Sequence, residues 1–370
     1  MLQQGKAVAD ILWYYGEDNN ITGLYSHSFP DIPSGYNFDF ANPDVLLNEI
    51  FVKDKKLCTK TGMQYSVLCL DPNTSKMSPE ISERIEYFKS CGIPVCGWTA
   101  EETKAELEKI GVAQDWIYSG TESLNFVHRS LHDAEIYWIS SPVAESRKAE
   151  VSLRCSGLKP YIWHPITGKI EECPYRFVDG RTILSLEFEP HDAYFIVLKG
   201  KTEIQELASA EKERKTICQI NGTWNIRFED KFGEQKAISS NDLKSWTGNT
   251  DEWIRHFSGT AIYSTTVSVS QHQGKIYLDL GVVKNIAEVY INGKKVQTLW
   301  KAPFIADISE YIHDGNADIE IKVTNLWVNR LIGDAEKSDR KSYTSKVFFK
   351  KDDPLLPSGL LGPVVIFEEL

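Results

Sequence analysis

The chain has 370 residues, of which 42% are hydrophobic and 25% charged, and its formal net charge is −11. This balance is typical of a folded globular protein with room for two or three domains, and it excludes a disordered or fibrous chain. The acidic charge argues against a nucleic-acid partner, because such proteins gather Lys and Arg on one face.

The first 118 residues alternate between strand-like and helix-like patterns. Three apolar runs have the length of buried strands: "VADILWYY" (8–15), "YSVLCLD" (65–71) and "IPVCGW" (93–98). A helix is expected from Pro79, with Ser78 as its N-cap and Gly92 after its end, and a second helix over 100–111. Strands that alternate with helices imply a parallel sheet, so residues 1–118 are predicted to form a small α/β domain of flavodoxin-like or amidotransferase-like type.

Near Ser119 the apolar pattern changes to a period of two. Short alternating segments, separated by Gly, Pro, Ser and Asp, predict a small β-sandwich domain over residues 119–203. The charged, weakly patterned stretch 201–215 is expected to be a linker.

The third predicted domain, residues 204–370, is again all-β and rich in aromatic residues. Asn292 and Gly293 separate two alternating segments, which predicts a type I′ hairpin because both turn residues must take positive φ. A region of this size, with strands of this length, is typical of one antiparallel sandwich.

No catalytic or cofactor motif is recognisable, so no catalytic residue, cofactor or metal site is assigned. The strand that ends at Leu70 is followed by Asp71 and Pro72, and not by the small-residue elbow of a serine or cysteine hydrolase. The seven Cys residues include no C-x-x-C pair, and no glycine-rich phosphate loop is present. A (β/α)-barrel that could carry a glycosidase carboxylate pair needs about 250 residues, more than the α/β region offers.

Membrane and export signals are also missing from the sequence. No apolar run approaches the length of a membrane span, of about 20 residues, so no membrane partner is expected. The segment "MLQQGKAVADILWYYGED" (1–18) has no cleavage-site pattern and is not expected to be a secretory signal. Its abrupt start suggests that the chain is a fragment of something longer.

Surface recognition by the third domain is the strongest functional indication. Sugar rings stack their C–H faces on aromatic side chains while their hydroxyls bind polar groups. The segment "TNLWVNRLIGD" (324–334) places such residues together. The sugar-binding candidates are Trp300, Asn325, Trp327, Asn329, Arg330 and Asp334. Two alternatives stay open: the Trp side chains fill the core, or the polar residues form a hydrogen-bonded loop network.

Five segments carry a resemblance to known families. The stretch "LDLGVVKNIAEVYINGKKVQTLWKAPFIADIS" (278–309) resembles the jelly-roll sugar-binding module of family-2-type glycosidases. Nearly the whole chain resembles the C-terminal part of the α-L-rhamnosidases of glycoside hydrolase family 106. That resemblance is carried, in the family's order, by "LQQGKAVADILWYYGED" (2–18), "PSGYNFDFANPDVLL" (33–47), "TNLWVNRLIGD" (324–334) and "DPLLPSGLLGPV" (353–364).

The resemblance implies a galactose-binding-like jelly roll over residues 204–370, a rhamnose-containing glycan as ligand, and a periplasmic or secreted parent protein. In that family the catalytic acid and base lie on an N-terminal barrel, which would be an intramolecular partner missing from this chain. The expected function is therefore the accessory C-terminal portion of an enzyme that hydrolyses terminal α-L-rhamnosyl linkages in plant polysaccharides or rhamnosides. By itself the chain is expected to be inactive.

Two further expectations accompany this interpretation. The alternative function is a stand-alone carbohydrate-binding protein without catalysis. Loss of the barrel should expose an apolar patch at the N-terminal strand and at "GYNFDF" (35–40).

Overall fold

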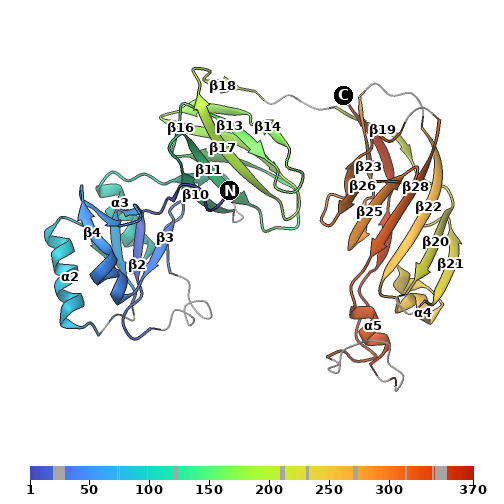
Figure 1. Ribbon diagram of the computed structural model, residues 1–370, viewed down its shortest axis with the longest axis horizontal. Coiled ribbons are helices and arrows are strands. Elements are labelled where there is room, and N and C mark those ends of the chain that lie inside the picture. The colour runs from blue at the N-terminus through green and yellow to red at the C-terminus, as the bar shows by residue number, and fades with distance from the viewer. Residues whose placement is uncertain are drawn as a thin grey trace. The chain divides into compact units, whose positions relative to one another are not determined.

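The computed structural model describes the chain except residues 20–29, 73, 75, 98, 121–123, 209–212, 231–232, 270–273, 313–314, 336 and 338–347. The chain divides into two compact units, Met1–Ser209 and Ala210–Leu370 (Figure 1). Both units consist mostly of β-strands, with few helices.

A parallel sheet opens the N-terminal unit. Its strand order is β3-β2-β7-β8, and the three apolar runs of the sequence supply β2, β7 and β8. The strands are β2 (Ile11–Tyr14), β3 (Phe38–Ala41), β7 (Val67–Leu70) and β8 (Val95–Cys96). A short antiparallel meander follows a π-helical turn: η1 (Val45–Glu49), β4 (Ile50–Lys53), β5 (Lys56–Thr59) and β6 (Gln64–Tyr65).

Two helices begin and end where their capping residues predict. Helix α2 (Pro79–Ser90) starts after Ser78, whose side chain accepts a hydrogen bond from the amide of Ile81. Helix α3 (Ala100–Lys109) is capped by Thr99 in the same way. Gly92 and Gly111 follow the two helices with positive φ, which ends each helix without the steric cost that a Cβ would bring.

The helices cover opposite faces of the parallel sheet (Figure 1). Phe88 of α2 packs in one cluster with Leu12 and Leu68, whereas Leu107 of α3 packs with Trp13 and Val67. Because successive side chains of a strand point to opposite faces, both faces of β2 are buried. The predicted exposure of the N-terminal strand is therefore wrong.

The rest of the N-terminal unit consists of two antiparallel sheets that share one hydrophobic core. The first sheet has the order β1 (Lys6–Ala7), β10 (Asn125–Ser130), β11 (Ala134–Ser140), β17 (Ala193–Lys201), β13 (Leu158–Trp163), β14 (Ile170–Glu172). The second has the order β18 (Glu206–Leu207), β15 (Tyr175–Val178), β16 (Arg181–Phe188), β12 (Arg147–Leu153), β9 (Trp116–Tyr118). Strand β18 lies inside the stretch expected to be a linker, whose residues 209–212 lie outside the described part.

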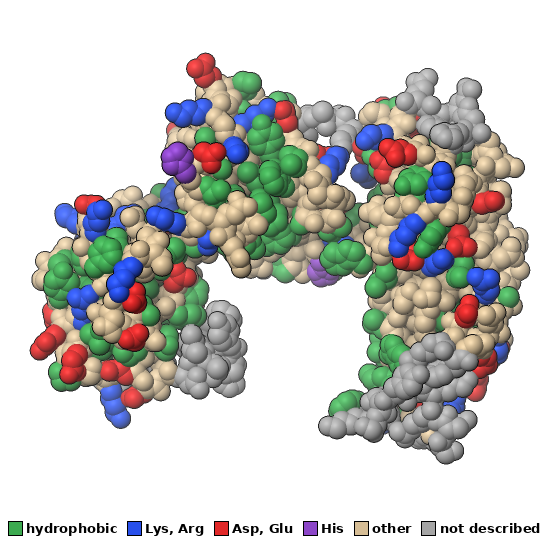
Figure 2. Space-filling model, viewed as in Figure 1, with side chains coloured by type: hydrophobic (Ala, Val, Ile, Leu, Met, Phe, Trp, Pro, Cys, Tyr) green, Lys and Arg blue, Asp and Glu red, His purple; other side chains and the backbone are tan. Residues whose placement is uncertain are grey.

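An apolar row crosses the outer face of the first of these sheets. Five neighbouring strands each contribute one directly paired residue: Val127, Trp138, Phe195, Trp163 and Ile170. Ile170 is 53% exposed and Val127 40% exposed, and the three aromatic residues between them are half-buried. Hydrophobic side chains gather over this sandwich in Figure 2. An apolar row with exposed ends thus lies on the sandwich, whereas the N-terminal strand β2 is buried.

The C-terminal unit is also built from packed antiparallel sheets over one core. Its largest sheet, named the wide sheet here, has the order β21 (Gln235–Ser240), β20 (Trp224–Glu229), β22 (Thr260–Val269), β28 (Gly315–Thr324), β25 (Ile286–Ile291), β26 (Lys294–Leu299). The opposing strands are β19 (Arg214–Gln219), β30 (Val365–Glu369), β23 (Lys275–Asp279) and β27 (Ile305–Asp307), with the pair β24 (Val282–Lys284) and β29 (Gly359–Gly362). The short helices are η2 (Trp246–Gly248), α4 (Glu252–Arg255) and α5 (Val328–Gly333).

Local sequence determines the turn between β25 and β26. Asn292 and Gly293 have φ values of 50° and 76°, as the predicted hairpin requires. Trp224 and Trp246 are buried in the core of this unit.

Candidate functional site

Two exposed tryptophans lie at one end of the wide sheet. Strand β25 is antiparallel to both β26 and β28, so the ends of β26 and β28 lie beside its first residue, Ile286. Trp300 follows β26 and is 58% exposed, and Trp327 follows β28 and is 43% exposed. The structure therefore brings two of the predicted side chains to the same end of one sheet.

A small pocket of about 160 Å³ opens at this end of the unit. Its wall is mainly apolar, and the side chains of Leu326 and Leu356 are largely exposed. Lys284 and Asn285 are polar residues of its lining. The lining residues are Lys284, Asn285, Leu326, Val328, Asn329, Leu356, Pro357 and Ser358. The segment before α5 thus forms one wall of a concave, largely apolar site.

Asn325 and Asn329 are buried and hydrogen-bonded around Ser358. The Nδ2 atoms of Asn325 and Asn329 lie 3.1 and 3.0 Å from the Ser358 hydroxyl oxygen. The Oδ1 atom of Asn325 accepts from the amide of Gly259, and that of Asn329 accepts from the amide of Leu356. These bonds tie the wall of the pocket to the segment 356–358. Direct contact of either amide with a sugar stays a prediction.

Arg330 on α5 forms an ion pair with Asp334, the residue that directly follows the helix. The Nε atom of Arg330 lies 3.5 Å from a carboxylate oxygen of Asp334, and both side chains are mostly buried. A cation near the end of a helix also interacts favourably with the helix dipole. The pair gives α5 a stabilising contact beside the pocket.

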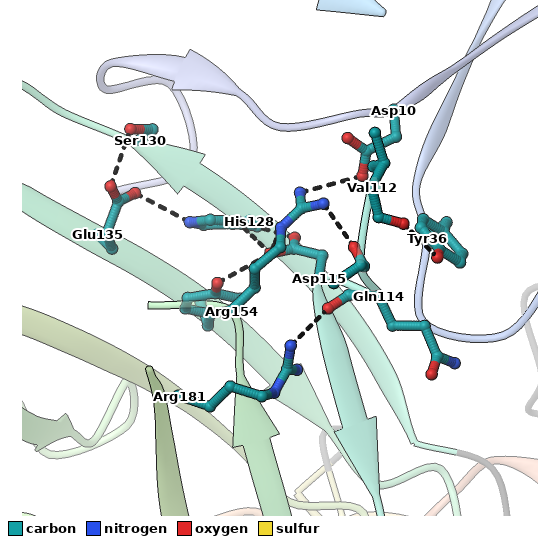
Figure 3. A network of polar contacts seen from close by, with 12 residues as sticks. Asp10, Tyr36, Val112, Gln114, Asp115, His128, Ser130, Glu135, Arg154 and Arg181 are labelled. Carbon is teal, nitrogen blue, oxygen red and sulfur yellow. Dashed lines mark hydrogen bonds and ion pairs between the residues drawn. The ribbon is translucent and has the colours of Figure 1, made fainter. Parts of the chain in front are cut away.

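A second polar cluster, named the junction network here, was not predicted from the sequence (Figure 3). Nδ1 of His128 lies 2.8 Å from the carboxylate of Asp115, and Nε2 lies 2.9 Å from that of Glu135. The Tyr137 hydroxyl donates to Asp115 at 2.9 Å. Arg154 reaches the carboxylate of Asp10 at 3.0 Å. The network therefore joins the segment that leads into the parallel sheet to the strands of the sandwich.

Burial and neighbouring charges shift the pKa values in the junction network, and for His128 and Asp10 the two effects oppose each other. Burial lowers the pKa of His128, but hydrogen bonds and charge interactions with Asp115 and Glu135 more than offset this effect, so the pKa is raised. Burial raises the pKa of Asp10, although the guanidinium of Arg154 opposes this shift. Burial also raises the pKa of Tyr137, which keeps its hydroxyl protonated as a donor.

The junction network lacks the arrangement of a catalytic triad. Both ring nitrogens of His128 face carboxylates, and the hydroxyl of Ser130 donates to Glu135 instead of contacting the imidazole. Among the residues that the structure describes, no group of three or more His, Cys, Asp or Glu side chains is arranged to hold a metal ion. The sequence gives one weak indication of the junction network, a His within the alternating segment "LNFVHRS" (124–130). The network has the character of a structural junction.

Two protein families match separate parts of the chain. Residues 1–106 and 99–177 match the family model of α-L-rhamnosidase, glycoside hydrolase family 106. Residues 194–348 match the sugar-binding domain of family 2 glycosyl hydrolases. Together these matches support a rhamnosidase-family protein with a sugar-binding domain.

A solved structure and a curated relative support this assignment. The rhamnosidase from Novosphingobium sp. PP1Y superposes with a TM-score of 0.88 at 28% identity, over 99% of this chain and 39% of that enzyme. A Formosa agariphila protein named "Putative beta-glucuronidase" is 38% identical over 198 residues, which are 46% of this chain and 17% of that protein. The chain thus spans well under half of either relative. Its match to a sugar-binding domain supports an interaction with carbohydrate.

No helix in the described ranges combines the length and the apolar character that a membrane crossing requires.

Proposed function

We propose that the protein to which this chain belongs hydrolyses terminal α-L-rhamnosyl linkages in plant polysaccharides or rhamnosides. The main support is the similarity of 99% of the chain to part of a solved rhamnosidase at a TM-score of 0.88. The catalytic acid and base would lie on a barrel outside this chain, and the chain would support that barrel. Hydrolysis of an aryl α-L-rhamnoside by the chain alone would contradict this division of roles.

The proposed domains are residues 1–118, 119–203 and 204–370. Helices on both faces of a parallel sheet support a small flavodoxin-like or amidotransferase-like α/β domain in the first range. A core shared by two antiparallel sheets supports a small β-sandwich in the second. The match to a sugar-binding domain supports a galactose-binding-like jelly roll in the third.

The proposed sugar site is the pocket beside α5 with the exposed rings of Trp300 and Trp327 near it. An aromatic face offers a stacking surface for a sugar ring, and the Asn285 amide can bind a hydroxyl. L-Rhamnose is a 6-deoxy sugar, so its methyl group suits the apolar wall formed by Leu326 and Leu356. Asn325, Asn329, Arg330 and Asp334 would hold this wall in place.

Calorimetric titration of the chain with methyl α-L-rhamnoside tests the proposed site. Saturable binding is expected at millimolar ligand, and Trp327→Ala or Asn285→Ala should weaken it at least about fivefold, the loss of one hydrogen bond or stacking contact. Ile170→Ala, an exposed apolar residue of the other unit, is the matched control and should leave binding unchanged.

Methyl α-L-mannoside is the matched control ligand, because it differs from the rhamnoside only by a hydroxyl at C6. An apolar wall should bind it more weakly, since the hydroxyl would lose its hydration. Flat heats with the rhamnoside, or binding that survives both substitutions, would rule out this site.

A further inference from the structure

A shallow groove of about 360 Å³ crosses the outer face of the wide sheet. It lies over β21, β20, β22 and β28, away from the core of the unit. One row of directly paired residues runs along it, namely Ser239, Asn225, Ser264 and Glu320. The next row contains Ala237, Arg227 and Ile262. The whole groove lies within the range 194–348 that matches a sugar-binding domain.

Neutral hydrogen-bonding groups and aliphatic surface alternate in the groove. The Ser239 hydroxyl donates to Oδ1 of Asn225 at 2.9 Å, which orients the amide. No bond to the Nδ2 group of Asn225 occurs within the described ranges, so both of its N–H donors are available. Ile262 offers apolar surface between these polar groups. Groups of this kind match the hydroxyls and C–H faces of a sugar ring.

The charges in the groove do not balance. The carboxylate of Glu320 is accompanied by the ammonium of Lys322 at 3.5 Å. Arg227 is exposed between Ala237 and Ile262, and within the described residues its guanidinium has no ion pair or hydrogen bond. The groove therefore presents an uncompensated cation, although the chain as a whole carries a net charge of −11.

We propose that this groove binds a carboxylate-bearing sugar, a uronic acid unit of an oligosaccharide. Arg227 would bind the carboxylate with two parallel N–H···O bonds, which a guanidinium does better than an ammonium. The Asn225 amide and the Ser264 hydroxyl would bind ring hydroxyls. The proposal rests on the carbohydrate-binding role proposed above, but it concerns a different surface and a different sugar.

Titration of the chain with a trisaccharide of α-1,4-linked galacturonic acid tests the inference. The same trisaccharide with its carboxyl groups reduced to alcohols keeps the hydroxyls and loses the charge. Binding of the acidic form is expected to be at least about tenfold tighter, and to weaken with rising salt because the ion pair is solvent-exposed. Equal binding of the two forms would overturn the inference.

Substitutions test whether the acidic trisaccharide binds in the groove. Arg227→Gln should reduce affinity for the acidic trisaccharide at least about tenfold, and Arg227→Lys should reduce it less. Lys215→Gln, which removes an exposed cation from a different sheet, is the matched control. Unfolding midpoints of all variants verify that they fold. Affinity that survives Arg227→Gln would overturn the assignment.

The two carbohydrate-binding proposals can be rejected independently of each other. Trp327→Ala should weaken binding of the rhamnoside and leave that of the acidic trisaccharide intact, and Arg227→Gln should do the reverse. Binding of the trisaccharide without binding of the rhamnoside would reject only the pocket beside α5. The converse would reject only the groove.

Discussion

His128 stacks on Tyr137 with ring centroids 3.8 Å apart and planes 14° from parallel, while both side chains bind the carboxylate of Asp115. The interaction places a buried imidazole between Asp115 and the carboxylate of Glu135, with Arg154 close to Asp115. Such a site favours the protonated imidazole, and the pKa of His128 is accordingly raised above its ordinary value of 6.5.

Stability of the N-terminal unit should depend on this proton. Because the folded-state pKa is raised, the stabilisation is fully present below pH 6.5 and is lost as pH rises through the folded-state pKa. Denaturant unfolding measured between pH 6 and pH 9 should show this loss. His128→Gln should lower the free energy of unfolding more at pH 6 than at pH 9. The same dependence on pH in wild type and variant would contradict the role of His128; His132→Gln, an exposed position, is the control.

Arg154 should be a stability determinant of the junction network. Its guanidinium contacts the carboxylate of Asp10 and lies 3.7 Å from that of Asp115, both largely buried. Arg154→Met leaves these carboxylates without their cation and should cost about 3 kcal/mol in the free energy of unfolding. Lys148→Met removes an exposed ion pair with Glu187 and should change stability by less than about 0.5 kcal/mol. A loss no larger than that of the control would show that the network is not stabilising.

Ser358 should hold the wall of the pocket beside α5. Its hydroxyl accepts from the amides of Asn325 and Asn329 and donates to the carbonyl of Leu356. Ser358→Ala leaves two buried amide donors short of an acceptor and should cost about 2 kcal/mol. Thermal unfolding measures this cost, with Ser185→Ala, exposed on β16, as control. Rhamnoside binding should weaken in the same variant, because the wall loses its anchor.

The apolar row from Val127 to Ile170 should make the isolated chain prone to association. Exposed apolar surface of this kind binds hydrophobic dyes and neighbouring molecules. Ile170→Lys together with Val127→Lys should reduce dye fluorescence and the weight-average mass in sedimentation. Ile204→Lys, also exposed but outside the row, should not. A wild-type chain that stays monomeric at high concentration and binds no dye would contradict this prediction.

Features determined over a few neighbouring residues could be predicted from the sequence. The bounds of α2 and α3 follow from Ser78, Pro79 and the glycines that succeed each helix, and the turn at Asn292 follows from the positive φ that it requires. The four segments that resemble the rhamnosidase family also lie within short stretches, so the family could be identified without knowledge of the contacts between distant residues.

The candidate site could be predicted only in part. "TNLWVNRLIGD" (324–334) indicated a group of polar and aromatic residues, and the structure places that segment along a pocket. Which of its side chains face solvent was not predictable, because the hydroxyl that binds Asn325 and Asn329 comes from the distant Ser358. Trp300 and Trp327 meet at one end of the sheet only through the pairing of β25 with β26 and β28.

The family resemblance, the mostly β character and the helix and turn boundaries could be predicted from the sequence, because local backbone preferences and short motifs carry that information. Which surfaces are available depends on contacts that form when the chain folds. Strand pairing aligned Val127, Trp138 and Phe195 into one apolar row, and folding brought Arg154 to the carboxylate of Asp10. Contacts of this kind join residues far apart in the chain, so no local pattern can specify them.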